Sequence, residues 1–294
     1  MFDGLESQGR RPEEVILVDS GSTDATVSIA WSRGARIVHI AAEDFTFGRA
    51  LNVGCAAATG DVLVFVSAHV YPTDQHWLEN LIRPFEEPTV ALAYGRQRGD
   101  DRTSFSEMQV LQRSFPDVSD DDQRTPFCDN ANCAIRRSWW QELPFDESLT
   151  GLEDLDWANR ALPRGGRIAY RADATIVHVH AESRQQTRNR YRREAIALNR
   201  IVPDQQVKAT RAAWLFLIST FRDYASAALQ GRIIRDFARI PAFRAAQFIG
   251  AWEGGRQRCE ISIELQRRFY YPKGFFALRA RTDLGRSAAA EAER

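Results

Sequence analysis

EVILVDSGSTD, residues 14–24, begins as an apolar, β-branched run and ends in a cluster of small and polar side chains. The run is typical of a buried strand, and the cluster is typical of a turn. Thr23 or Asp24 can cap a helix over about residues 24–33, and RIVHI at 36–40 predicts a second strand. Strand, helix and strand in this order form the repeating unit of an α/β fold.

The same alternation continues to about residue 94. Small residues predict a helix over 47–59, and the wholly apolar residues 62–66 predict a strand buried on both faces. A helix over 74–86 and a strand over 90–94 follow. This order predicts a parallel, doubly wound sheet, whose ligands bind beyond the carboxyl ends of the strands.

Residues 104–200 follow a less regular pattern. We expect a strand near 131–136, helices near 138–142 and 153–163, strands near 167–170 and 174–180, and a long helix over 184–200. After Pro203, helical patterns dominate. The patterns therefore divide the chain into an α/β domain over 1–202 and a helical region over 203–294.

Charge is distributed unevenly, although the formal net charge is zero. Residues 1–200 carry 23 basic and 30 acidic side chains, and residues 201–294 carry 16 and 9. The basic surplus indicates either an anionic partner or an ordinary solvated face. Residues 212–229 begin apolar but are too interrupted to span a membrane, so they form either a packed helix or an interfacial helix on a membrane surface.

Several classes of protein are excluded by composition. The four cysteines (55, 128, 133 and 259) form no CxxC pair, which argues against a disulfide framework or a zinc-thiolate site. No signal peptide, spanning helix or nucleic-acid-binding module is recognisable. We therefore expect a cytoplasmic protein without a nucleic-acid partner, peripheral at the inner face of the membrane if residues 212–229 are interfacial.

Polar side chains follow two of the predicted strands at the same edge of the sheet. Asp19 and Ser20 end the first strand, where a carboxylate can accept hydrogen bonds from a base or ribose, although Asp also favours turns. Ser67 and His69 follow strand 62–66. A neutral imidazole there can ligate a divalent ion or contact a diphosphate, although a lone His often only bonds a loop carbonyl.

Two further clusters lie later in the chain. Glu153 and Asp154 stand in the first turn of a predicted helix, where carboxylates can act as bases but also favour the helix dipole by about 0.3–1 kcal/mol. His178 and His180 are two residues apart on a strand, so their side chains share one face. Such a pair can bind a metal, although His-x-His alone is a weak signal.

The order and spacing of these clusters resemble the inverting glycosyltransferase family 2 over about residues 5–200. The family's D-x-G-S-x-D, D-x-D and E-D motifs look like residues 19–24, 67–69 and 153–154. The resemblance implies a GT-A fold, a mostly parallel sheet flanked by helices, here with an α-helical C-terminal appendage. It also implies a nucleotide-sugar donor and a divalent cation, Mn²⁺ or Mg²⁺.

The resemblance assigns roles to residues of this sequence. Asp154 would be the general base, and the charge of Glu153 beside it would tend to raise one carboxyl pKa. The metal or diphosphate ligands would be His69, His178 and His180. The donor-binding residues implied in the same way are Asp19, Ser20, Arg49, Asn52, Ser67 and Asn132, with Asn132 lining the donor-sugar and acceptor side.

Two departures from the family pattern are visible. The D-x-D position reads S-A-H, and imidazole in place of carboxylate lowers affinity for Mg²⁺ while remaining compatible with Mn²⁺. Residues 1–8 look like the end of the family's first helix, so we expect the family's first strand to be missing from this chain.

The expected reaction is transfer of a sugar, with inversion, from a nucleotide-diphosphate donor to a hydroxyl of a polysaccharide, lipid-linked or similar glycan. Residues 96–126 are expected to contribute specificity. Two alternatives remain open. A catalytically silent GT-A-like protein that binds nucleotide or glycan would explain the S-A-H sequence. A nucleotidyltransferase would need a Gly-rich phosphate loop, and none is visible.

Overall fold

The computed structural model describes residues 1–180, 182–203, 207–257 and 269. Contacts group Met1–Arg256 into one compact unit and Gln257–Arg294 into a second. Most of the second unit, including Cys259, lies outside the described residues. The division expected at residue 203 stays a prediction, since the helices that follow it belong to the first unit by contacts.

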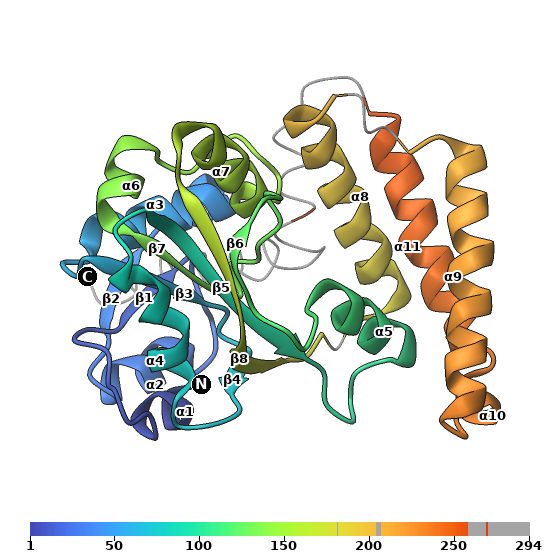
Figure 1. Cartoon of the computed structure of the whole chain (residues 1–294), viewed down its shortest axis with the longest axis horizontal. Helices are drawn as coiled ribbons and strands as arrows, with labels where there is room; N and C mark the ends of the chain where they lie inside the picture. The colour runs from blue at the N-terminus through green and yellow to red at the C-terminus, as the bar shows by residue number, and fades with distance from the viewer. Residues whose placement is uncertain (181, 204–206, 258–268, 270–294) are drawn as a thin grey trace, which may run out of the picture. The chain divides into compact units, whose positions relative to one another are not determined.

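The first part of the chain alternates strands and helices nearly as expected (Figure 1). Its elements are α1 (Phe2–Glu6), β1 (Ile16–Asp19), α2 (Thr26–Ser32), β2 (Arg36–His39), the 3-10 turn η1 (Ala42–Asp44), α3 (Phe47–Ala57), β3 (Val62–Val66), β4 (Val70–Pro72), α4 (Trp77–Ile82), the 3-10 turn η2 (Arg83–Glu86) and β5 (Val90–Arg98).

The later elements are α5 (Phe105–Ser114), β6 (Asp120–Gln123), β7 (Asn132–Arg136), α6 (Arg137–Glu142), α7 (Glu153–Ala161), the 3-10 turn η3 (Leu162–Arg164), β8 (Arg167–His178), α8 (Arg184–Ile201), α9 (Ala209–Leu229), α10 (Ile233–Asp236) and α11 (Arg239–Gly255). The two strands expected near 167–170 and 174–180 are one continuous strand, β8, which shifts register against β5 after Gly95.

The sheet is mixed, so the expectation of a mostly parallel sheet was wrong. β1 and β2 form a parallel pair, and the larger sheet has the order β3-β7-β5-β8-β4 with β6 added beside β8. In that larger sheet only β5 and β8 run parallel. The reason is β7, which inserts between β3 and β5 and runs opposite to both. Hydrophobic runs predict a strand but carry no information about its direction.

Alternation along the central strands divides the core between two faces of the larger sheet. Cys133 and Ile135 of β7 pack with Trp157 of α7 on one face, whereas Ala134 packs with Trp77 of α4 on the other. This is the period of two expected of a strand covered on both sides. The loops that carry polar side chains are thereby held at the ends of a rigid, buried sheet.

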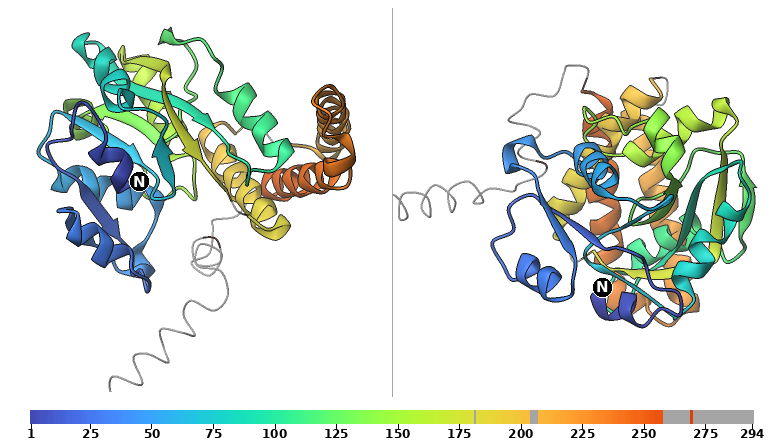
Figure 2. Two further views of the ribbon diagram at one scale, coloured as in Figure 1. Left: turned by 90° about the horizontal axis from the view of Figure 1, so that it is seen from below. Right: turned by 90° about the vertical axis from the view of Figure 1, so that its left-hand side faces the viewer.

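Three long helices, α8, α11 and α9, lie side by side with α11 in the middle (Figures 1 and 2). Gly250 and Gly254 of α11 meet the backbone of α8 so closely that a Cβ at either position would clash. Arg244 of α11 donates from Nε to Asp223 of α9 at 2.7 Å, and both side chains are fully buried. Among the described residues, no helix is long and apolar enough to cross a membrane.

Candidate active site

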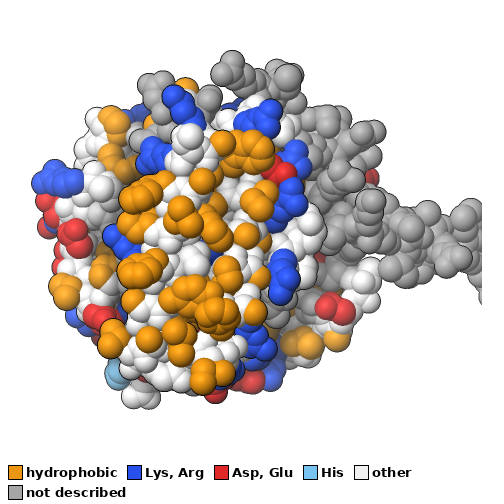
Figure 3. Space-filling view, turned by 90° about the vertical axis from the view of Figure 1, so that its right-hand side faces the viewer, with side chains coloured by type: hydrophobic (Ala, Val, Ile, Leu, Met, Phe, Trp, Pro, Cys, Tyr) orange, Lys and Arg blue, Asp and Glu red, His pale blue; other side chains and the backbone are white. Residues whose placement is uncertain are grey.

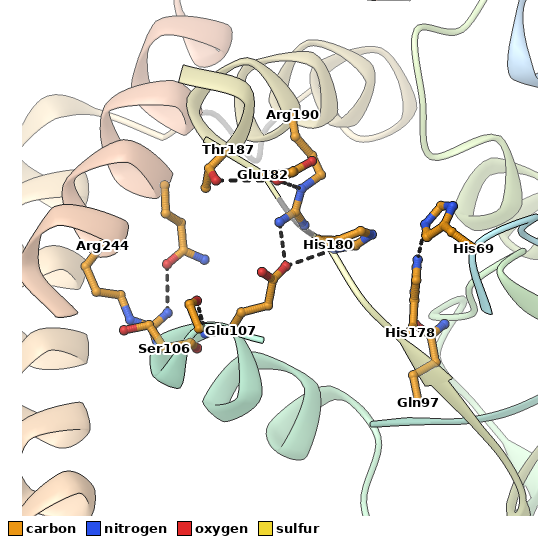
Figure 4. A network of polar contacts seen from close by, with 12 residues as sticks. His69, Gln97, Ser106, Glu107, His178, His180, Glu182, Thr187, Arg190 and Arg244 are labelled. Atoms are coloured by element: carbon orange, nitrogen blue, oxygen red, sulfur yellow. Dashed lines mark hydrogen bonds and ion pairs between the residues drawn. The ribbon is translucent and has the colours of Figure 1, made fainter. Parts of the chain in front are cut away.

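Strand pairing brings the three predicted metal-binding histidines together. Val70 of β4 lies opposite His178 of β8 in antiparallel register, so His69 reaches the end of β8. His180 follows two residues after His178 on the same side. The ligating atoms of His69, His178 and His180 lie within 4.8 Å of one another, and the Nε2 atoms of His69 and His178 are 2.8 Å apart. Figure 4 shows these two rings facing each other.

Two of the imidazoles are oriented by hydrogen bonds through Nδ1. His178 Nδ1 lies 2.7 Å from Gln97 Oε1, and His180 Nδ1 lies 2.9 Å from Glu107 Oε1. A carbonyl or carboxylate oxygen only accepts, so both Nδ1 atoms carry the proton and both Nε2 atoms keep a lone pair. An outer partner that fixes the tautomer in this way is typical of metal-ligating histidines.

Burial keeps the clustered imidazoles uncharged. Burial, followed by the neighbouring charges of His180 and His69, lowers the pKa of His178 to about 2. Burial and His180 also lower the pKa of His69, against a smaller opposing effect of Glu182. A neutral imidazole is the form that binds a metal ion.

Glu107 connects the histidines to α8. Its Oε1 accepts from Arg190 Nη2 at 2.7 Å as well as from His180, and Arg190 Nε donates to Glu182 at 2.9 Å (Figure 4). Burial alone would raise the pKa of Glu107, but the hydrogen bond from His180 and the charge of Arg190 outweigh it and hold that pKa below its usual range. Glu107 is therefore an ionised carboxylate. The sequence gave no signal for it beyond its place in 96–126.

The second predicted cluster begins α7. Leu152, just before the helix, has φ 56°, the left-handed region that a branched side chain rarely adopts, and such strain gathers at functional sites. Asp154 accepts from the backbone N–H of Asn130 at 3.0 Å and from that of Leu155 at 2.8 Å. Glu153 accepts from the Asn130 side chain at 3.3 Å. Both carboxyl groups are thus held against the segment that precedes β7.

The pKa of Asp154 is raised well above its ordinary value. Burial is the largest cause, and the negative charges of Glu153 and Asp129 follow. Glu153 is also raised, mainly by burial, against hydrogen bonds from its own backbone N–H and from Asn130. Two adjacent buried carboxyl groups give at least one of them the basicity that proton abstraction near neutral pH requires.

Asp129 is the residue that the sequence reading missed. Burial raises its pKa, whereas the Ala131 N–H, Gln97 and the charge of His180 lower it. The same carboxyl group raises the pKa of Asp154. Asp129 is therefore electrostatically coupled both to the histidine cluster and to the acids of α7, so these two groups belong to one site. It stands three residues before Asn132, in a segment already noted, but nothing in the spacing distinguished it.

Comparisons with known proteins bear on this arrangement. Residues 1–143 match the family model described as glycosyl transferase family 2. These residues form a family 2 glycosyltransferase domain. The family expected from the D-x-G-S-x-D, S-A-H and E-D segments is confirmed.

Curated relatives include two enzymes named for O-antigen synthesis. The chain is 28% identical over 204 residues to O-antigen chain rhamnosyltransferase RfbN of Salmonella typhimurium, covering 65% of this chain and 65% of the relative. It is 29% identical over 201 residues to O-antigen chain rhamnosyltransferase WbaN of Salmonella anatum, covering 65% and 64%. The match thus spans just under two thirds of the length of these relatives.

Solved structures confirm the GT-A fold class. Mannosyltransferase PcManGT from Pyrobaculum calidifontis, solved with GDP-Man and Mn²⁺, superposes with a TM-score of 0.53 at 18% identity, over 92% of this chain and 82% of that one. S. aureus TarS 1-349, solved with UDP, gives 0.50 at 17% identity, over 88% of each chain. At these identities the likeness concerns the fold alone.

The predicted nucleotide contacts of the family 2 domain lie on other elements. Asp19 at the end of β1 is buried and accepts from the backbone N–H groups of Gly21 and Ser22 at 3.1 and 3.0 Å, next to His39. Burial alone would raise the pKa of Asp19, but the hydrogen bonds from Ser22 and Gly21 keep it lowered. Ser20 follows Asp19 in this turn and is half-buried.

Arg49 and Asn52 of α3 both contact Glu147. Asn52 Nδ2 donates to Glu147 and to the carbonyl of Phe145, and its Oδ1 accepts from Trp140 Nε1 and the Phe145 N–H. Arg49 Nη1 lies 3.4 Å from Glu147. Asn52 therefore fixes the 140–147 segment to α3, which corrects its expected place as a donor contact. Ser67 holds the turn between β3 and β4, where its carbonyl accepts from the Val70 N–H.

Asn132 also has a structural place instead of the expected one on the donor-sugar side. It is fully buried, and its Nδ2 donates to the carbonyls of Ala174 and Arg96 at 2.9 and 3.2 Å. Its Oδ1 accepts from Trp77 Nε1 at 2.9 Å. With every amide position directed at the protein, Asn132 joins β7, β5, β8 and α4 and has no group left for a ligand.

Replacing Asn132 with alanine should destabilise the domain by about 2–4 kcal/mol, because the buried partners of its amide lose their hydrogen bonds. Urea unfolding followed by fluorescence measures this change. Asn80→Ala is the matched control, since the Asn80 bonds to Asp173 and Arg83 are solvent-exposed, and it should cost less than about 1 kcal/mol. Equal costs for the two variants would contradict the assignment.

Proposed function

We propose that this protein transfers a sugar, with inversion, from a nucleotide-diphosphate donor to a hydroxyl group of a glycan. The observation that carries the proposal is the coupling of a buried, basic carboxylate at the start of α7 to three neutral imidazoles through Asp129. The family 2 match and the rhamnosyltransferase relatives support the reaction class. The names of those relatives favour a polysaccharide or lipid-linked acceptor and a rhamnosyl donor.

Asp154 acts in this proposal as the general base. Its carboxylate takes the proton of the acceptor hydroxyl while the oxygen bonds to the anomeric carbon, and the bond from that carbon to the diphosphate oxygen breaks. The electron pair leaves with the nucleoside diphosphate, so no acid is needed to protonate it. One attack from the opposite side inverts the anomeric centre. Glu153 and Asp129 support the reaction by keeping Asp154 basic.

The histidine cluster fits a divalent metal ion that accepts nitrogen ligands. His69, His178 and His180 offer three imidazole nitrogens, and the Nδ1 bonds of His178 and His180 leave their Nε2 atoms free to ligate. An all-nitrogen set suits Mn²⁺ better than Mg²⁺, and Mn²⁺ is the ion in the PcManGT complex. When bound, such an ion supplies positive charge for the departing diphosphate.

Nucleotide release in the presence of Mn²⁺ tests the proposal. The protein would be given UDP-, GDP- and dTDP-sugars, including activated rhamnose, with lipid-linked and free oligosaccharide acceptors. We expect turnover with one donor, and a product whose anomeric configuration, read by nuclear magnetic resonance, is opposite to that of the donor. Retention of configuration would refute the inverting mechanism. Tight nucleotide binding without transfer to any acceptor would favour the catalytically silent alternative.

Replacing Glu107 with glutamine should weaken Mn²⁺ binding by about 10- to 100-fold, because the carboxylate that orients His180 loses its charge. Isothermal titration calorimetry with Mn²⁺ alone measures this without reference to turnover. Glu79→Gln is the control, since Glu79 is exposed and lies 3.7 Å from His76, outside the cluster. An unchanged Mn²⁺ affinity in the Glu107 variant would remove Glu107 from the site.

A further inference from the structure

Large apolar side chains are exposed on the outer side of α9 and on α10. Trp214, Leu217 and Phe221 are 62%, 60% and 73% exposed and follow one another at helical spacing along α9. Ile234 and Phe237, at 93% and 61%, continue the surface around α10. The Tyr224 ring stacks on that of Phe237 at 5.3 Å, which holds the two parts together. We call these five exposed residues the α9–α10 face, and Figure 3 shows apolar side chains gathered over this side of the molecule.

The α9–α10 face belongs to a firmly packed helix. On the inner side of α9, Asp223 forms its buried ion pair with Arg244, and Ala227 packs with Phe105 and Ile240. The exposed apolar residues are therefore directed outward by a fixed helix. A contiguous apolar patch on a folded protein is typical of an interaction site.

The charge around the face has one sign. Over residues 207–257 the exposed charged side chains are Lys208, Arg211, Arg222, Arg235, Arg239 and Arg256. The acidic residues in the same range, Asp223, Asp236 and Glu253, are each paired with an arginine. Figure 3 shows basic side chains along the edges of the apolar area. The partner of this surface must therefore be apolar in its middle and negatively charged around it.

We propose that the α9–α10 face docks on the surface of an anionic lipid bilayer. Exposed Trp, Leu and Phe beside a basic rim are the features of a helix that lies in the headgroup region. A second copy of the chain fits less well, because a two-fold interface through this face would bring two arginine rims together. No helix of the described chain crosses a membrane, so the attachment is peripheral.

Vesicle co-sedimentation of the full chain tests this proposal independently of any transferase activity. Vesicles of phosphatidylcholine with about one third phosphatidylglycerol would be compared with vesicles of phosphatidylcholine alone. We expect binding to the anionic vesicles that is at least about tenfold stronger and that weakens as salt is raised. Failure to bind anionic vesicles, or equal binding to both kinds, overturns the proposal.

Matched variants locate the surface. Trp214→Ser with Phe221→Ser should reduce binding at least about tenfold, whereas Trp31→Ser, at a tryptophan 73% exposed on α2, should leave it unchanged. Arg222→Glu with Arg235→Glu should do the same, against Arg10→Glu with Arg11→Glu, which are exposed near the N-terminus.

Folding and self-association complete the test. An unchanged thermal transition shows that each variant is folded, as expected for exposed positions. Full binding by the folded face variants would overturn the proposal. So would a concentration-dependent dimer in sedimentation velocity that Trp214→Ser abolishes, because the face would then belong to a second copy.

Discussion

Replacing Asp154 with asparagine should lower kcat by about 10²- to 10⁴-fold, the usual contribution of a positioned general base. Asparagine keeps the size of the side chain and can still accept from the backbone N–H of Asn130. It cannot take a proton from the acceptor hydroxyl. Because this interaction develops in the transition state, KM for the donor should change little. Initial rates of nucleotide release measure both constants.

Asp156→Asn is the matched control for this prediction. Asp156 lies in the same first turn of α7, but its carboxylate is bonded to Arg160 at 2.7 Å, within the same helix. We expect kcat to stay within about twofold of the unmodified protein, since surface ion pairs of this kind contribute only about 0.2–1 kcal/mol. A comparable loss in both variants would mean that α7 has been disturbed and that Asp154 has no special part.

The dependence of the rate on pH follows from the raised pKa of Asp154. A base works only when deprotonated, so kcat/KM should rise with pH through this pKa, and the rise should lie above the range of an ordinary aspartate. Burial is the largest cause of the shift, followed by the charges of Glu153 and Asp129. Asp129→Asn removes one of these charges and should move the rise to lower pH. An unmoved profile would contradict the coupling through Asp129.

Stability supplies a second readout for the same variant. A carboxyl group whose pKa is raised on folding favours the folded state when protonated, and that contribution is lost as pH rises through the folded pKa. At neutral pH, Asp154→Asn should therefore raise Tm, by roughly 2–4 °C for each kcal/mol of repulsion relieved. A variant that is inactive yet more stable cannot be explained by misfolding.

The sequence predicted most elements of the fold because their signals are local. The turn after Asp19, the apolar run 62–66 and the acidic start of α7 each depend on residues close together in the chain. Strand direction does not, since β7 pairs antiparallel with β3 and β5 only because the long segment before it returns along the sheet. That pairing is a tertiary choice among similar apolar strands, and no periodicity encodes it.

The candidate site could be predicted where the chemistry of a residue type was decisive. The three histidines converge because the registers of β4 and β8 place them together, and imidazole is rare enough in this chain to be noticed. Asn132 and Asn52 were misjudged because an amide suits a buried structural bond as well as a ligand. Asp129 was missed since its importance comes from burial beside other charges, a property of the folded chain alone.

Replacing His178 with asparagine should weaken Mn²⁺ binding by at least about 10²-fold and reduce kcat/KM by a similar factor. Asparagine places an N–H donor near the former Nδ1, so the bond to Gln97 Oε1 can persist, whereas the Nε2 that faces His69 is removed. The variant thus separates the ligating nitrogen from the one that anchors the ring. Losing positive charge near the departing diphosphate commonly costs about 10²–10³ in kcat.

His76→Gln controls for a general effect of losing an imidazole, because His76 is 58% exposed and its contacts are with Gln75, Asp74 and Glu79. Its Mn²⁺ affinity, read by calorimetry, should match that of the unmodified protein. If His178→Asn bound Mn²⁺ normally but lost activity, His178 would contact the diphosphate directly and the metal would lie elsewhere. If both properties were unchanged, the imidazoles would only close the end of β8, and Asp154 would act without a metal site of this composition.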